Sequence, residues 1–171
     1  MCGIVGFIGH DLDRVGIERA VRSLHHRGPD GFGIYRDPRE RVGLGHARLS
    51  IIDPENGAQP LFDPDGDLVV VCNGEVYDFE RLRARLQRFG HSFYTDSDSE
   101  VIPHLYREYG MDFVHHLRGE FAFLLLDRKK RRLIAGCDRF GIKPLFYHEN
   151  NGNFLFASEA KAIFATELHK P

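Results

Sequence analysis

Hydrophobic and polar positions alternate along much of the chain with a period of two, which is typical of β-strands that bury one face. Together with a few short apolar runs, this pattern predicts strands over residues 4–8, 32–36, 42–48, 68–72, 120–127, 133–138, 145–148 and 154–158. The run 68–72 is apolar throughout, which indicates a fully buried strand. We expect Asn73 and Gly74 to end it, because Asn-Gly is a strong turn signal.

Apolar residues recur at helical spacing in residues 15–24, 79–89 and 99–109, and a closing helix is expected over 159–165. Gly90 and Gly110 follow the second and third of these segments, and Ser97 and Ser99 are candidate N-caps of the third. Two groups of strands with helices between them predict a layered α+β or sandwich fold.

Composition and charge limit which classes of function the sequence supports. The chain has 171 residues, enough for one domain with a substantial core, and its formal charge of -2 gives no electrostatic argument for nucleic acid or an anionic membrane. The longest apolar run, residues 121–126, is too short to cross a bilayer, and the N-terminus lacks the pattern of a signal peptide.

The three cysteines are an odd number with no close-spaced pair, so they predict neither a disulfide framework nor a zinc site. A reducing, cytoplasmic location fits this usage best. We expect Cys72 and Cys137, which lie within predicted strands, to be small buried apolar residues. The adjacent histidine pairs 25–26 and 115–116 would point in different directions, so no metal site is expected.

Cys2 is the first candidate for chemistry. If Met1 is removed, a thiol and an α-amine belong to one residue. Thiols titrate near pH ~8.5 and α-amines near ~7.7–8.0, so the amine can accept the thiol proton, directly or through a water. The alternative is that Cys2 is only a small residue after the start of the chain.

Asn73 and Gly74 have a second interpretation besides a turn. An Asn side-chain amide and a Gly backbone N–H can form an oxyanion hole, in which one donor is worth roughly 3–4 kcal/mol in the transition state. A glycine would suit the second donor because no Cβ would block the substrate.

Arg48 and Asp98 are candidates for binding an α-amino acid. The planar guanidinium of Arg48 could bind a carboxylate through two hydrogen bonds, and Asp98 could accept hydrogen bonds from an ammonium group. The alternatives are a surface arginine with a packed stem and an aspartate that caps a helix.

Eight segments together carry a family resemblance, and they run in order over nearly the whole chain: residues 1–4, 26–30, 48–53, 73–77, 97–100, 119–123, 138–145 and 157–159. The chain resembles the glutaminase domain of class II glutamine amidotransferases, which are N-terminal nucleophile hydrolases. Pro29, the Ser-Asp-x-Glu motif at 97–100 and residues 141–147 are most similar to the asparagine synthetase branch. The resemblance implies one glutamine amidotransferase type-2 domain over residues 1–171, folded as a four-layer αββα sandwich of two antiparallel sheets.

The resemblance also implies roles. Cys2 would attack the side-chain amide of glutamine with its own α-amine as general base, and Asn73 and Gly74 would hold the oxyanion. Arg48 would bind the glutamine carboxylate, while Asp98 and Glu75 would hold the ammonium group. The remaining pocket would be lined by Leu49, Ser50, Ile51 and Ile52, the last two through their backbone.

Full-length members of this branch carry a C-terminal synthetase domain that forms an acyl-adenylate from ATP and uses the ammonia. Its Ser-Gly-Gly-x-Asp-Ser motif is absent from these residues, as is a G-x-x-x-x-G-K-[ST] loop. We therefore expect a fragment or a stand-alone glutaminase subunit with no cofactor of its own, with ATP and Mg expected only in the synthetase partner.

Several alternatives stay open at this point. The chain could be a non-catalytic domain that senses glutamine, or an amidotransferase for an acceptor other than aspartate, such as a sugar. The sequence also leaves open whether Met1 is removed and what the oligomeric state is, a homodimer being one option.

Overall fold

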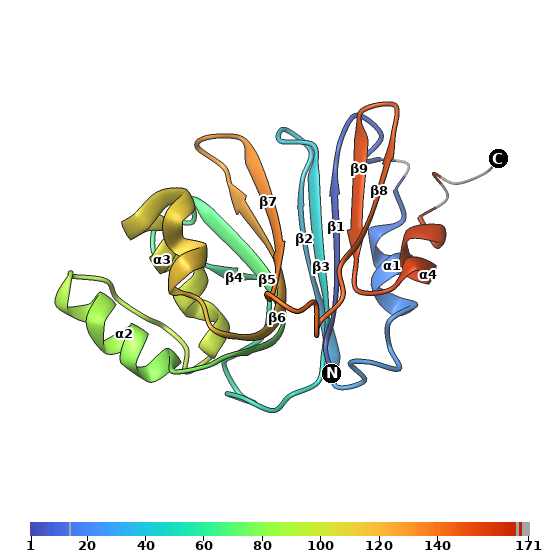
Figure 1. Ribbon diagram of the computed structural model, residues 1–171. Helices are drawn as coiled ribbons and strands as arrows, with labels where there is room; N and C mark the ends of the chain where they lie inside the picture. The colour runs from blue at the N-terminus through green and yellow to red at the C-terminus, as the bar shows by residue number, and fades with distance from the viewer. Residues whose placement is uncertain (14, 167, 169–171) are drawn as a thin grey trace.

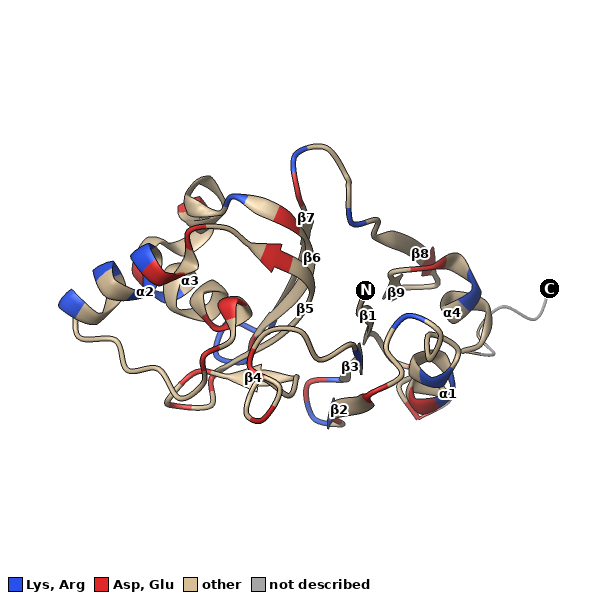
Figure 2. Cartoon of the chain, turned by 90° about the horizontal axis from the view of Figure 1, so that it is seen from below, with Lys and Arg blue, Asp and Glu red and all other residues tan. Residues whose placement is uncertain are grey.

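Two antiparallel sheets lie face to face, and helices cover the outer face of each (Figure 1). This computed structural model describes residues 1–13, 15–166 and 168. The layers follow the order helix, sheet, sheet, helix, which confirms the expected αββα sandwich. Lys and Arg are interspersed with Asp and Glu over the described chain (Figure 2).

The first sheet has five strands, in the order β2 (Gly31–Asp37), β3 (Val42–Arg48), β1 (Gly3–Ile8), β9 (Asn153–Ala157) and β8 (Phe146–Asn150). Helices α1 (Ile17–Arg22) and α4 (Ala160–Phe164) pack on its outer face (Figure 1). The leading strand β1 is therefore central. Its Ile4 N–H donates to Ser158 Oγ at 2.9 Å, and its Ile4 carbonyl accepts from Ser158 N–H at 3.0 Å.

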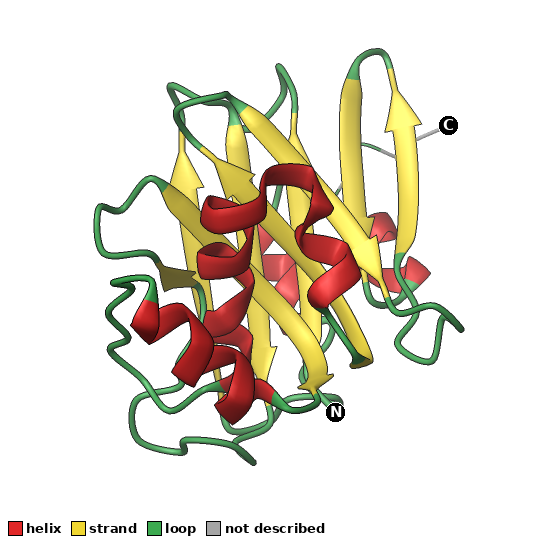
Figure 3. Ribbon diagram, turned by 60° about the vertical axis from the view of Figure 1, so that its left-hand side comes forward, coloured by secondary structure: helices red, strands yellow, loops and turns green. Residues whose placement is uncertain are grey.

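The second sheet has four strands, in the order β4 (Leu61–Phe62), β5 (Leu68–Val76), β6 (Gly119–Asp127) and β7 (Arg132–Cys137). Helices α2 (Phe79–Arg88) and α3 (Val101–Tyr109) cover its outer face (Figure 3). Two 3₁₀ helices flank α3: η1 (Asp98–Glu100) before it and η2 (Gly110–His116) after it.

Strand alternation divides the buried side chains into three layers. The layer between the sheets contains Ile4, Leu44, Val71 and Leu124, among others. The other two layers lie under the helices on either side. Burying each such side chain contributes roughly 1.5–3 kcal/mol, so the inter-sheet layer holds the two sheets in one relative position.

The structure corrects several expectations from the sequence. Asn73 and Gly74 do not end a strand: β5 continues to Val76, because β6 pairs with it through this dipeptide. Cys137 is exposed rather than buried, since it ends the edge strand β7, whereas Cys72 is buried as expected.

Element boundaries also differ. The helix expected over 15–24 covers only residues 17–22, and the segment 99–109 begins with the 3₁₀ turn η1 instead of regular α-helix. The short strand β4 and the helix η2 were not expected from the sequence pattern. None of the helices in the described ranges is long and apolar enough to cross a membrane.

Candidate active site

The apolar layer between the sheets becomes polar at one end. On β3 the inward positions run Val42, Leu44, His46, Arg48, and on β5 they run Val69, Val71, Asn73. On β1 the inward Ile4 is preceded two residues earlier by Cys2, at the end of the sandwich where the N-terminus lies (Figure 1). Alternation therefore sends polar side chains from three strands into one space.

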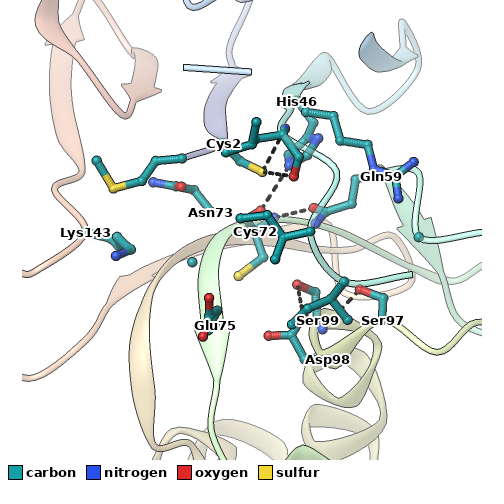
Figure 4. Close-up of a pocket in the computed structure, with 17 residues that line it drawn as sticks. Cys2, His46, Gln59, Cys72, Asn73, Glu75, Ser97, Asp98, Ser99 and Lys143 are labelled. Atoms are coloured by element: carbon teal, nitrogen blue, oxygen red, sulfur yellow. Dashed lines mark hydrogen bonds between the residues drawn. The ribbon is translucent and has the colours of Figure 1, made fainter. Parts of the chain in front are cut away.

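A cleft occupies this polar end (Figure 4). It is lined by Met1, Cys2, His46, Arg48, Leu49, Ile51, Ile52, Gly57, Gln59, Cys72, Asn73, Gly74, Glu75, Ser97, Asp98, Ser99 and Lys143. Residues from both sheets and from the loops that join them thus share one cavity.

Cys2 is held at the cleft by its neighbours. Its Sγ accepts a hydrogen bond from Leu49 N–H at 3.4 Å and lies 3.6 Å from the Leu49 carbonyl oxygen. The carbonyl oxygen of Cys2 accepts from Arg27 Nε at 2.8 Å. Both the thiol and the main chain of this residue are therefore oriented. With Met1 still attached, the nitrogen of Cys2 is an amide and cannot act as a base.

The hydrogen-bond pattern of β5 determines which backbone groups face the cleft. Residue pairs joined by hydrogen bonds alternate with pairs that are not joined along an antiparallel ladder. At the two ends of the β5–β6 ladder, Tyr77 N–H donates to Arg118 O and Arg128 N–H donates to Asp67 O. Odd-numbered residues of β5 therefore bond to β6, and the groups that face away from β6 belong to Leu68, Val70, Cys72, Gly74 and Val76.

Four of these five outward N–H groups have partners in place, and that of Leu68 donates to Asp63 Oδ1 at 2.9 Å. Val70 pairs with β4, Cys72 N–H donates to Gln59 Oε1 at 2.6 Å, and Val76 N–H donates to Asp98 Oδ2 at 2.6 Å. The N–H of Gly74 has no hydrogen-bond partner among the described residues and borders the cleft. It is the position in this row left available to a ligand.

The side-chain amide of Asn73 is also unsatisfied. Asn73 is fully buried, and neither its Nδ2 nor its Oδ1 has a hydrogen-bond partner within the described ranges. A buried amide without a partner costs about 1–3 kcal/mol, so native structures rarely retain one without a reason. Together with Gly74 N–H, this amide provides two donors on consecutive residues at the cleft.

Gly74 is required here for a different reason from the one expected. Its φ of +129° lies in a region that residues with a Cβ rarely adopt. A Cβ at this position would also collide with the carbonyl oxygen of Glu120 on β6. The glycine therefore permits close packing of β5 on β6, which keeps its N–H aimed away from that strand.

Arg48 is fixed by the loop beyond its strand. Its Nη1 donates to the Pro54 carbonyl oxygen at 3.0 Å, and its Nη2 donates to the Asp53 carbonyl oxygen. A guanidinium has five N–H groups. Arg48 therefore keeps donors for a ligand carboxylate in the cleft it lines.

Asp98 and Glu75 bring acidic groups to the cleft (Figure 4), which Arg48 also lines. Burial raises the pKa of Asp98, and hydrogen bonds from Val76 and Ser99 partly oppose this. Ser97, rather than Asp98, caps the 3₁₀ turn, since Ser97 Oγ accepts from Ser99 N–H at 3.3 Å. Asp98 instead joins η1 to β5.

The cleft brings together most of the residues selected from the sequence. Leu49, Ile51 and Ile52 line it, but Ser50 does not. The N–H of Ser50 donates to Asp30 Oδ2 at 2.7 Å, which orients the loop after β3.

Sequence reasoning missed His46, Gln59 and Lys143, which line the cleft, and Arg27, which lies behind Cys2. Lys143 Nζ donates to Glu120 Oε2 at 2.9 Å. Strand alternation on β3 was a usable signal for His46, because it places this residue on the same face as Arg48. Among the described residues, no group of three or more His, Cys, Asp or Glu could hold a metal ion.

Comparison with known proteins agrees with this geometry. The family described as "Glutamine amidotransferase domain" matches residues 1–171. The chain is 42% identical to "Amidase chry2" of Gibberella zeae, with 98% of this chain and 27% of that protein aligned. It is 45% identical to "Asparagine synthetase [glutamine-hydrolyzing] 2" of Oryza sativa subsp. japonica (95% and 28%), and 42% identical to "Asparagine synthetase [glutamine-hydrolyzing] 1" of Bacillus subtilis (98% and 27%). The chain thus spans little more than a quarter of the length of these curated relatives.

Solved structures share the fold. The glutamine phosphoribosylpyrophosphate amidotransferase of B. subtilis, complexed with ADP and GMP, superposes with a TM-score of 0.79 at 24% identity, covering 96% of this chain and 43% of that one. A structure described as the allosteric regulatory enzyme of purine biosynthesis gives a TM-score of 0.80 at 25% identity, with the same coverage.

Proposed function

Because this chain belongs to the family of glutamine amidotransferase domains, we propose that it hydrolyses L-glutamine to glutamate and ammonia with Cys2 as the nucleophile. One observation carries the proposal. Cys2 lines the same cleft as a buried, unpaired Asn73 amide and an available Gly74 N–H. A nucleophile beside two preorganised donors is the arrangement that acyl transfer requires.

In the proposed reaction, removal of Met1 first gives Cys2 a free α-amine. This amine takes the thiol proton as the sulfur attacks the side-chain carbonyl carbon of glutamine. Asn73 Nδ2 and Gly74 N–H stabilise the negative oxygen that forms. The C–N bond then breaks, ammonia leaves with a proton from the α-ammonium, and a thioester remains. Water hydrolyses the thioester to glutamate and restores the thiol.

The charged residues of the cleft support glutamine as the substrate. Arg48 would bind the α-carboxylate, and Asp98 and Glu75 would accept hydrogen bonds from the α-ammonium group. Two opposite charges at a fixed spacing orient the substrate so that only its side-chain amide reaches Cys2. Such positioning converts binding energy into rate.

We further propose that the ammonia is passed to an asparagine-synthetase-like domain or subunit, in which ATP and Mg²⁺ would act. The similarity to asparagine synthetases and the short span of each relative that this chain covers support this. A reducing compartment such as the cytoplasm suits the proposal, because the nucleophilic thiol must escape oxidation.

The test compares the purified chain with Cys2→Ala, Cys2→Ser and the control Cys137→Ala, whose thiol is exposed and outside the cleft lining. Intact mass would report whether Met1 is removed, and ammonia release from glutamine would report activity. We expect loss of hydrolysis in both Cys2 variants, with unchanged circular dichroism, and full activity in the control. Retained hydrolysis in Cys2→Ala would rule out the mechanism, and a processed but inactive wild type would favour a glutamine-sensing domain.

A further inference from the structure

The peptide groups of Cys72 are held from both sides by side chains. Gln59 Oε1 accepts from Cys72 N–H at 2.6 Å, and His46 Nε2 lies 3.1 Å from the Cys72 carbonyl oxygen (Figure 4). Cys72 directly precedes Asn73 and Gly74. Neither Gln59 nor His46 has a role in the reaction proposed above, although both line the cleft.

β5 needs these partners because its neighbouring strand is short. β4 pairs only with Val69 and Val70, so the outward groups of Cys72 face no strand. Without Gln59 and His46 these groups would be left to water, and β5 would be fixed from one side only as it enters the cleft. Side chains from two different segments thus replace the missing strand.

His46 also connects the two sheets. On β3, His46 is paired with Ile4 of β1, and Ile4 is two positions after Cys2 in the sequence. The His46 ring reaches across to β5. The hydrogen bond therefore runs from the sheet that carries the nucleophile to the sheet that carries the oxyanion donors. A change in this contact would alter the position of one set of groups relative to the other.

The chemistry of His46 suits a fixed role. The residue is 1% exposed, and burial lowers its pKa to about 4 despite the hydrogen bond to Cys72. The ring is therefore neutral near pH 7, with the proton on Nε2 where it can be donated to the carbonyl oxygen. Nδ1 is buried and has no partner in the described part of the chain. A group that is neutral and locked in one tautomer does not act as a proton carrier.

We propose that His46 and Gln59 are positioning residues that clamp the Cys72 peptide and so keep the Asn73 and Gly74 donors aimed at the oxygen of the tetrahedral intermediate. The inference rests on the proposed glutamine hydrolysis. A displacement of about 1 Å can cost roughly 100-fold in rate. The clamp acts on the transition state, so its loss lowers kcat while leaving KM nearly unchanged.

The experiment uses two substitutions that remove the hydrogen bonds and two that retain them. His46→Leu and Gln59→Met remove the donor and the acceptor at similar volume, whereas His46→Gln retains a donor and Gln59→Glu retains an acceptor. Leu44→Val is the control for general destabilisation, because Leu44 on β3 belongs to the apolar layer between the sheets and Cys72 to the layer under the helices.

Three readouts separate positioning from folding. Steady-state kinetics give kcat and KM for glutamine. Inhibition by glutamate γ-semialdehyde reports on the Asn73 and Gly74 donors. The Cys2 thiol adds to its aldehyde carbon, and the aldehyde oxygen then lies at the oxyanion site. Alkylation of Cys2 by iodoacetamide reports on the thiol alone, because that reaction does not use the Asn73 and Gly74 donors.

We expect His46→Leu and Gln59→Met to lower kcat by about 10- to 100-fold and to weaken semialdehyde binding by a similar factor. KM and the alkylation rate should stay within about threefold, and His46→Gln and Gln59→Glu should recover part of kcat. Leu44→Val should lower Tm and leave kcat unchanged.

Unchanged kcat and semialdehyde affinity in a folded Gln59→Met or His46→Leu variant would overturn the inference, as would a rise in KM alone. If His46→Leu does not fold, Gln59→Met decides the question independently. A wild-type chain that has lost Met1 and still does not hydrolyse glutamine would refute the proposed function, whereas an active wild type with unaffected variants would refute only the clamp.

Discussion

Arg27 donates a 2.8 Å hydrogen bond from Nε to the carbonyl oxygen of Cys2, across 25 residues of sequence. The same guanidinium donates through Nη1 to Glu159 Oε1 at 3.0 Å, and the Arg27 side chain is only 9% exposed. The second residue of the chain is thereby tied to the residue that precedes α4. Cys2 is held by its main chain as well as by its sulfur.

Removing the hydrogen bonds of Arg27 should affect both the stability of the fold and its activity. We expect Arg27→Ala to lower the free energy of unfolding by about 1.5–3 kcal/mol, because hydrogen bonds to charged groups contribute this much. Glutamine hydrolysis should fall by roughly tenfold, since the Cys2 main chain is no longer fixed. Urea denaturation and ammonia release measure the two effects. Arg36→Ala, which breaks an exposed pair with Asp13, is the control and should cost under about 1 kcal/mol.

The dependence of the free energy of unfolding on acidic pH should involve Glu159. Burial alone would raise its pKa, but hydrogen bonds from Arg27, His26 and Lys161 outweigh this and lower the pKa to about 2. A carboxyl with a lowered pKa in the folded state stabilises the fold above its unfolded pKa and loses this contribution as pH falls.

We therefore expect Glu159→Gln to be less stable than the wild type by about 1–2 kcal/mol at pH 7, after allowing for the partial exposure of the carboxylate. The gap should close between pH ~5 and ~2. Urea denaturation at pH 7, 5 and 3 tests this. A gap that stays constant over the range would show that the loss comes from packing and not from charge.

A substitution at Asn73 should lower activity without lowering thermal stability. We expect Asn73→Leu, which is close in size, to lower kcat by about 10²–10³-fold, because one oxyanion donor is lost. Tm should stay the same or rise, since a buried amide without a partner is removed. A large fall in Tm would mean that the amide is satisfied in solution.

Substitutions at Gly74 and Gly31 allow a matched comparison of a crowded and an open glycine position. A Cβ at Gly74 would strike the Glu120 carbonyl oxygen at an unfavourable φ, whereas a Cβ at Gly31 meets nothing within 4 Å. We expect Gly74→Ala to destabilise the fold by more than about 3 kcal/mol and Gly31→Ala to change it by under about 1 kcal/mol. Thermal unfolding compares them, and equal Tm values would refute the packing argument.

Thiol labelling should distinguish the three cysteines. Burial raises the pKa of Cys72, so its thiol is both inaccessible and protonated. We expect a thiol reagent to label Cys2 and exposed Cys137 in the native state, and Cys72 only after unfolding. Mass spectrometry of peptides after timed labelling measures this. Early labelling of Cys72 would show that the end of β5 opens readily.

Local sequence patterns predicted the core strands well because burial and alternation are local properties. The same alternation directs Arg48 from one sheet and Asn73 from the other into the space between the sheets, where Cys2 also lies. The Asn-Gly turn signal failed because pairing with Ala122 and Phe121 of β6 overrides it. Cys137 was placed wrongly because a sequence does not reveal which strand lies at a sheet edge.

Three of the four residues that sequence reasoning missed share a physical feature. Arg27, His46 and Gln59 bond to backbone atoms of residues far away in the chain. Backbone N–H and carbonyl groups are the same in nearly every residue, so no pattern of side chains reveals the partner. These contacts follow only from the three-dimensional arrangement of the strands.

The central position of β1 has a consequence for biosynthesis. Ile4 completes its hydrogen bonds only with Ser158, which leaves the ribosome some 150 residues after it. β1 can pair with β3 early, but it lacks its second neighbour until residues 153–157 of β9 have been made. The surroundings of Cys2 are thus complete only after β9 has been made and has paired with β1.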